Sequence, residues 1–150
     1  MALQIESKAY SAEVGERSDC AVRAFAVAAC VPYETARALC ECAGRKANQG
    51  TPWRALKTVA AELVPGAVPQ IARVDFIGDP TLAQFAAAHT TGHYVVILEP
   101  RRWSHAVALI DGVVHDHARY SWRGVANGVA NGPRKHAGAR RRVMYFFKFV

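Results

Sequence analysis

Residues 20–29 read CAVRAFAVAA, a segment that would be apolar on every side of a helix except at Arg23. An α-helix that is hydrophobic all round is normally buried at the centre of a domain. Ser18 or Asp19 can cap its N-terminus, which places Cys20 in the first turn. The rest of the chain must therefore supply the layers that cover a central helix beginning at Cys20.

The hydrophobic pattern predicts three more helices before the middle of the chain. One begins after Pro32 and ends at Gly44, one begins after Thr51-Pro52 and buries Trp53 with its apolar stripe, and one opens at Asp79-Pro80. Residues 65–78 are expected to be irregular, with a short strand at 71–77. The first half is thus mainly helical.

The pattern then changes to that of strands, at residues 93–98, 105–110, 113–117 and 143–150. Helices followed by an antiparallel sheet are typical of the α+β class. The sequence contains no linker that would divide it, so we expect a single domain over residues 1–150.

An Asp-Gly dipeptide at 111–112, between two apolar runs, is typical of a two-residue β-hairpin turn. With this turn Ile110 pairs with Val113. The same register places His105 and Asp116 on one face, diagonally opposite and ~7–8 Å apart at the backbone. A hydrogen bond between them would fix the tautomer and the orientation of the imidazole.

Cys20 is the candidate nucleophile, because a thiol in the first turn lies at the positive end of the helix dipole, which favours the thiolate. If this end of the helix packs against the hairpin face that carries His105 and Asp116, the three side chains form a nucleophile, a base and an orienting group. Sequence spacing leaves that contact open.

The segment SDCAVRAFAVAAC, followed much later by HAVALIDGVVHD, resembles the papain-like cysteine peptidase superfamily. The likeness is greatest to the compact branch of bacteriocin-leader peptidases and to their small stand-alone bacterial and bacteriophage relatives, and it runs from about residue 17 to 117. It implies a papain-like α+β fold, with a helical N-terminal half whose central nucleophile helix packs on a C-terminal antiparallel β-sheet. It also implies Cys20 as nucleophile, His105 as general base and acid, and Asp116 as the group that orients His105.

The expected function is that of a cysteine peptidase or a related thiol acyl-transfer hydrolase. It would act on a protein or peptide through a thioester intermediate, without a cofactor. Deamidation, isopeptide cleavage and transglutaminase-type chemistry use the same constellation, so the acceptor stays open.

The sequence departs from the family before the nucleophile. Such peptidases usually carry a Gln about six residues earlier that completes the oxyanion hole, whereas residues 13–15 read EVG, and Ala21 stands where Gly is common. The backbone N–H of Cys20, together with Ser18 or the region of Asp19, would have to substitute. Because a missing oxyanion donor can cost ~10²–10³ in rate, a second interpretation stays open. It is a weak or inactive papain-like module that acts as a phage virion component or binds a host protein or nucleic acid.

The formal net charge of +7 comes from the C-terminal third, since residues 101–150 hold ten basic and two acidic side chains. The basic cluster comprises Arg134, Lys135, Arg140, Arg141 and Arg142. Such a cluster is either a solvated face or a surface for an acidic partner, including assembly into a larger particle.

The remaining cysteines and histidines carry weaker predictions. Cys40 falls on the inward stripe of its helix and is expected in the core, while Cys30 and Cys42 lack CxxC spacing, so we expect no disulfide framework. His115 and His117 with Cys40 or Cys42 do not make a four-ligand pattern, and no metal is predicted.

The cellular location is expected to be the cytoplasm, or the host cytoplasm or virion if a phage encodes the chain. The N-terminal region is interrupted by Glu6, Lys8 and Glu13, unlike a secretory signal. No apolar run approaches the roughly 20 residues of a membrane helix, and no membrane contact is predicted.

Overall fold

The fold is described here from a computed structural model, for residues 18–72, 78–99, 105–116 and 140–149. The helices in these ranges are α2 (Cys20–Ala29), α3 (Tyr33–Cys42), α4 (Trp53–Leu63) and α5 (Leu82–Ala88). The strands are β1 (Gln70–Ile71), β2 (His93–Leu98), β3 (His105–Ile110), β4 (Val113–His115) and β5 (Val143–Lys148). They form one five-stranded antiparallel sheet in the order β1-β5-β2-β3-β4. The expected α+β class is confirmed.

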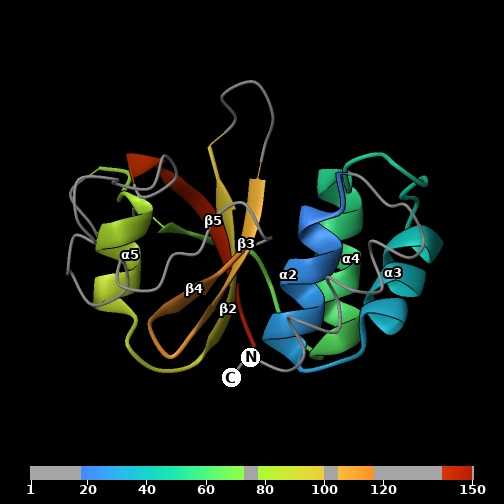
Figure 1. Cartoon of the computed structure of the whole chain (residues 1–150), viewed down its shortest axis with the longest axis horizontal. Helices are drawn as coiled ribbons and strands as arrows, with labels where there is room; N and C mark the ends of the chain where they lie inside the picture. Colours follow the sequence, from blue (N-terminus) through green and yellow to red (C-terminus); the bar gives the residue numbers. More distant parts are fainter. Residues whose placement is uncertain (1–17, 73–77, 100–104, 117–139, 150) are drawn as a thin grey trace.

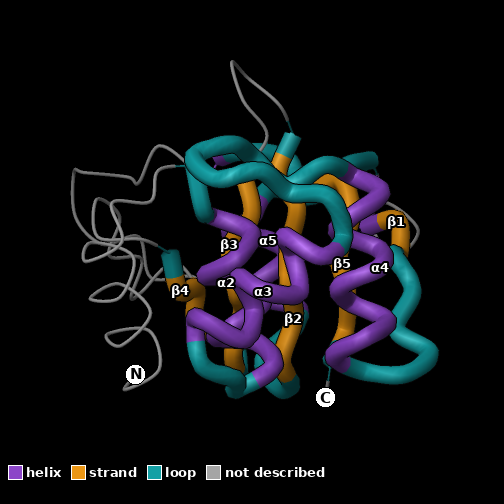
Figure 2. Tube along the Cα trace, turned by 90° about the vertical axis from the view of Figure 1, so that its right-hand side faces the viewer, coloured by secondary structure: helices purple, strands orange, loops and turns teal. Residues whose placement is uncertain are grey.

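The sheet lies between two groups of helices, with α2, α3 and α4 on one face and α5 on the other (Figure 1). From the side of the first group, α2 and α3 lie in front of the strands (Figure 2). Phe25 of α2 is fully buried, and its ring lies 6.1 Å from that of Phe147 and 6.0 Å from that of Phe149. On the other face Phe85 of α5 packs on Phe146, with ring centroids 5.0 Å apart. The apolar helix predicted at 20–29 is therefore the centre of one of two cores.

The β3–β4 hairpin has the predicted register, with Ile110 opposite Val113. Both turn residues have positive φ, 47° at Asp111 and 77° at Gly112, as a type I′ turn requires. A Cβ at Gly112 would lie 3.2 Å from the Cα of Thr90, so glycine also suits the space. The turn therefore fixes the register of β3 and β4, and with it which residues lie opposite each other at the far ends of the two strands.

Three boundaries differ from the sequence expectation. β1 covers Gln70–Ile71 instead of 71–77, of which residues 73–77 lie outside the described ranges. β4 ends at His115, so Asp116 comes directly after the strand. β5 ends at Lys148. The two edge strands of the sheet, β1 and β4, are therefore both short.

Trp53 was expected to be buried by its helical stripe, and this is wrong. The residue is 40% exposed and packs on side chains of β5, with its ring 4.7 Å from that of Tyr145. It is the first residue of α4, where the helix has only begun to cover β5. For the first residue of a helix, burial depends on the elements around it more than on its place in the apolar stripe of the helix.

The helix α5 begins at Leu82 and has at its N-terminus a capping box of Thr81 and Gln84, which was not predicted from the sequence. The N–H of Gln84 donates to Oγ1 of Thr81 (3.2 Å), and the N–H of Thr81 donates to Oε1 of Gln84 (2.9 Å). Two N–H groups of the helix end are thereby satisfied. Asp79-Pro80 marks the turn that precedes this box.

Thr81→Ala is expected to lower the free energy of unfolding by about 1 kcal/mol, because it removes the side chain that caps α5. Urea unfolding followed by circular dichroism measures the change. The matched control is Thr58→Ala on the exposed side of α4, where the hydroxyl donates to the carbonyl of Arg54. Equal losses in the two variants would contradict a specific role of the cap.

None of the helices in the described ranges combines the length and the apolar character that a membrane crossing requires.

Candidate active site

The candidate site lies where α2 begins and the β3–β4 hairpin ends. Cys20 is the first residue of α2, His105 is the first residue of β3, and Asp116 follows β4. In Figure 1 α2 lies beside β3, and these two elements pack closely. The three residues singled out by the sequence therefore come together from separate parts of the chain.

His105 is held by Asp116 on one side and interacts with Cys20. Its Nε2 lies 2.8 Å from Oδ2 and 2.9 Å from Oδ1 of the carboxylate, and the thiol of Cys20 is near enough to contribute to raising the pKa of His105. Because Nε2 is directed at the carboxylate, Nδ1 is the ring nitrogen left for the thiol. The predicted hydrogen bond between His105 and Asp116 is present.

The charge of His105 is set by these contacts. Burial alone lowers the pKa of His105, but the hydrogen bonds with Asp116 and Cys20 and the charges of these groups together raise it to about 9. The side chain of His105 is 15% exposed and that of Asp116 only 2%, so water screens the pair weakly. The imidazole is therefore protonated at neutral pH and can both stabilise a thiolate and donate a proton.

The side chains meet at the end of the sheet, which differs from the arrangement considered from the sequence. Ala106 and Ala108 belong to the core under α2, while Val107 and Leu109 face α5. Thus α2 packs on the hairpin face opposite the one that the alternation assigns to His105. The contact with Cys20 forms because His105 begins its strand and Asp116 lies beyond the end of β4, where the strict alternation of faces no longer applies.

The residues before the nucleophile depart from the expected cap. Asp19 occupies the N-cap position of α2 but makes no side-chain capping hydrogen bond. Its Oδ2 instead accepts from the hydroxyl of Tyr33 (2.7 Å) and from Nε of Arg23 (3.1 Å). Ser18 has a positive φ of 54°, a conformation that is uncommon outside glycine. Tyr33 was not identified from the sequence, where only its place at the start of a helix distinguishes it.

The positions expected to lack an oxyanion glutamine, residues 13–15, lie outside the described residues, as does His117. Ala21 is buried in the first turn of α2. No three His, Cys, Asp or Glu side chains among the described residues lie close enough to hold a metal ion.

The other cysteines lie away from the site, and all four are free thiols. Cys40 is fully buried in α3, where burial raises the pKa of its thiol to about 11, and its predicted place in the core is confirmed. Cys30 and Cys42 are exposed. Cys30 follows α2 at its other end, with its Sγ 3.8 Å from Nδ1 of His93. Cys20 is the cysteine that interacts with the His105–Asp116 pair.

Part of the basic cluster makes contacts within the protein. Arg141 donates from Nη2 to the carbonyl of Glu99 (2.6 Å), and Arg142 donates from Nη1 to the carbonyl of Asp79 (2.8 Å). Arg140 is exposed, whereas Arg134 and Lys135 lie outside the described residues. Two of the five basic side chains therefore help to hold the start of β5.

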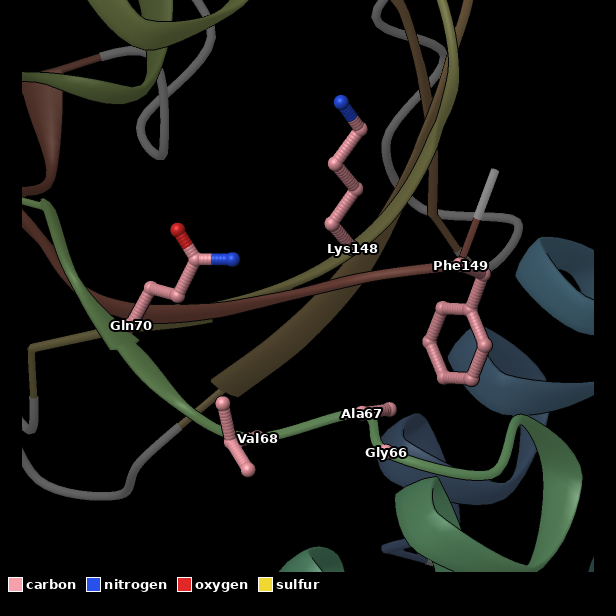
Figure 3. Close-up of a pocket in the computed structure, with 6 residues that line it drawn as sticks. All are labelled: Gly66, Ala67, Val68, Gln70, Lys148 and Phe149. Carbon is pink, nitrogen blue, oxygen red and sulfur yellow. The ribbon is translucent and has the colours of Figure 1, made fainter.

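A hollow of about 280 Å³ lies at the edge of the sheet opposite β4 (Figure 3). It is lined by Gly66, Ala67, Val68, Gln70, Lys148 and Phe149. None of these residues belongs to the Cys20 site. Lys148 and Gln70 point to the same side of the strands in the close-up, while the ring of Phe149 points the other way.

Comparisons of the chain with protein-family models, with curated proteins and with solved structures found no match. The class that the structure itself defines is an α+β domain with a cysteine, a histidine and an aspartate at one end of its sheet.

Proposed function

We propose that the chain is a papain-like cysteine peptidase or a related thiol acyl-transfer hydrolase. The observation that carries the proposal is the place of His105, which is hydrogen-bonded to a buried Asp116 and lies near enough to Cys20, at the start of a helix, for the thiol to help raise its pKa. A protonated imidazole and a helix N-terminus both favour a thiolate. An activated thiol with an oriented base is the requirement for covalent acyl transfer.

The papain-like assignment is supported by the order and the setting of the three residues. The nucleophile begins a central helix, and the histidine and aspartate follow on an antiparallel sheet that this helix covers. The helical half precedes most of the sheet, as in the family that the sequence resembles. The likeness extends over the elements that form the site.

In the first step the thiolate of Cys20 attacks a carbonyl carbon of a protein or peptide substrate. The C–S bond forms, the imidazolium of His105 gives its proton to the leaving nitrogen, and the C–N bond breaks to leave a thioester. Neutral His105 then takes a proton from water, whose oxygen attacks the thioester and releases the carboxylic acid and the thiolate. Asp116 holds the ring and stabilises its charged form throughout.

The nature of the acceptor decides which reaction of this class takes place. Water gives hydrolysis of a peptide, isopeptide or side-chain amide bond, and an amine in its place gives transamidation. Both use the same thioester, so the site chemistry is common to them. Basic residues of the C-terminal third, such as the exposed Arg140, would favour an acidic substrate or partner protein.

The test is the pH dependence of alkylation by a haloacetamide, with mass spectrometry to locate the label. Cys20 is expected to react rapidly at pH 6, where a thiol of ordinary pKa ~8.5 is less than ~1% thiolate. The exposed Cys42 serves as internal reference, and the buried Cys40 reports unfolding if it is labelled. His105→Ala is expected to remove the rapid reaction at pH 6.

Two outcomes would contradict the proposal. One is labelling of Cys20 in parallel with Cys42 over the whole pH range. The other is rapid labelling that persists in His105→Ala while Cys40 remains protected. Either would favour a papain-like module without catalysis.

A further inference from the structure

The carboxylate of Asp19, next to the nucleophile, points into the protein. Asp19 is 5% exposed and stands at the N-cap of α2, directly before Cys20. An aspartate at this position normally accepts a hydrogen bond from the N–H of the second or third helical residue. Here one oxygen, Oδ2, is bound by Tyr33 and Arg23, and the capping bond is not made.

Tyr33 and Arg23 bind this carboxylate from different helices, one through a neutral hydroxyl and the other through a charged guanidinium. Arg23 lies one turn along α2 and provides the opposite charge at 3.1 Å. Tyr33 is the first residue of α3 and is only 3% exposed, so its ring is fixed by packing and its hydroxyl points at the carboxylate from a second helix. The hydrogen bond from Tyr33, at 2.7 Å, is the shorter of the two. It is the contact that ties the carboxylate to a second helix.

The position of this charge matters for the thiol beside it. The first N–H groups of a helix have no partner inside the helix and act on any anion at that end. A carboxylate in the capping position would take up these N–H groups and add a negative charge beside the thiolate. Both effects would oppose the ionised form of Cys20 and an oxyanion formed next to it.

We propose that Tyr33 is a positioning residue for the thiolate, and that it acts by holding the carboxylate of Asp19 away from the first turn of α2. This inference rests on the function proposed above. It assigns to the first-turn N–H groups the part that an oxyanion glutamine would otherwise share, and it gives the buried Tyr33–Asp19–Arg23 contacts a role in reactivity.

Tyr33→Phe tests the inference, because it keeps the ring and removes only the hydroxyl. We expect alkylation of Cys20 at pH 6 by iodoacetamide to slow by roughly 3- to 10-fold, the range that a charge at a helix end produces. With iodoacetate the loss is expected to be larger, since the released carboxylate also repels an anionic reagent. Tyr145→Phe is the matched control, because that ring lies on Trp53 away from the site.

A second substitution shows whether the effect passes through Asp19. Asn in its place carries no charge, so Asp19→Asn is expected to keep both alkylation rates within about 2-fold of the parent. Tyr33→Phe is expected to have a smaller effect in that background, because a released amide can still take up the N–H groups but adds no negative charge. A loss of tenfold or more in Asp19→Asn alone would overturn the inference, as would a Tyr33→Phe effect of equal size in both backgrounds.

The same assay separates the inference from the proposed function. If the parent protein reacts at pH 6 no faster than His105→Ala, the proposed function fails and the inference fails with it. If the parent reacts rapidly and Tyr33→Phe matches Tyr145→Phe with both reagents, only the inference is overturned. Labelling of Cys40 would reveal a folding defect in Tyr33→Phe, and the Asp19→Asn measurement then decides.

Discussion

Asp116→Ala is expected to lower the rate of Cys20 alkylation at pH 6 by on the order of 10²-fold, the ratio between a thiolate and a thiol of ordinary pKa at that pH. Asp116 accounts for a hydrogen bond and a charge that raise the pKa of His105 against its burial. Without the carboxylate, burial favours the neutral imidazole, which no longer stabilises the thiolate. The measurement is the labelling assay with Cys42 as reference.

Asp116→Asn separates the hydrogen bond from the charge. In the parent, Nε2 of His105 lies 2.8–2.9 Å from the two carboxylate oxygens. The amide oxygen of the variant can still accept a hydrogen bond from Nε2, but it carries no negative charge. We expect a loss of roughly tenfold, between those of the parent and the alanine variant, because a hydrogen bond to a charged group is about twice as strong as a neutral one. Glu62→Gln, on the exposed side of α4, is the matched control for loss of a carboxylate.

The contrasting result would be equal reactivity of the parent, Asp116→Asn and Asp116→Ala. It would mean that Asp116 only completes the packing around the hairpin. In that case the alanine variant would still lose stability, by about 1–3 kcal/mol, because a buried ring N–H is left without its acceptor. Unfolding and alkylation measured on the same variants therefore distinguish a structural role from a chemical one.

The half of the site on the hairpin could be predicted from the sequence because its geometry is local. The Asp-Gly turn fixes the register of β3 and β4, and the register in turn places His105 beside Asp116. Backbone pairing of this kind depends on a few adjacent residues. The nucleophile helix could be predicted equally well, since a helix that is apolar on all sides is normally central.

The contact between Cys20 and His105 could not be predicted in this way. It depends on which face of the sheet α2 covers and on how far along β3 the helix begins, and both are decided by packing between distant segments. The expected contact was on the hairpin face that carries His105, where alternation also places Val107 and Leu109, whereas α2 covers Ala106 and Ala108 on the other face. Small side chains on that face leave room for a helix to approach, a feature that alternation alone does not reveal.

The role of Asp19 shows the same limit at the scale of one side chain. The sequence identifies a residue able to cap α2, and the local rule predicts a capping bond. In the folded protein Tyr33 competes for the same carboxylate from another helix, and its hydrogen bond replaces the cap. Local propensity indicates which hydrogen bonds a side chain can make, while tertiary contacts decide which of them forms.

The second large effect concerns stability, which in a Cys20→Ala background, where position 20 no longer titrates, is expected to fall by up to about 3 kcal/mol as the pH rises from about 6.5 to about 9. The pKa of His105 is raised to about 9 in the folded protein from its ordinary 6.5, mainly because the hydrogen bonds and charges of Asp116 and Cys20 outweigh burial. Below pH 6.5 both the folded and the unfolded chain hold the proton, and the stabilisation is fully present. Between the two values the unfolded chain releases the proton first, so the stabilisation declines and is lost above pH 9.

His105→Gln is the control for this dependence, since glutamine can donate to Asp116 but does not titrate. The difference in unfolding free energy between Cys20→Ala and the double variant Cys20→Ala/His105→Gln, from urea denaturation, is expected to shrink steadily between pH 6.5 and 9. The raised pKa of Cys40, about 11, affects stability only above its ordinary value of 9.0 and is common to both proteins. A difference that stays constant over this range would mean that His105 is not held protonated in the fold. The imidazolium required to stabilise a thiolate at Cys20 would then be missing at neutral pH.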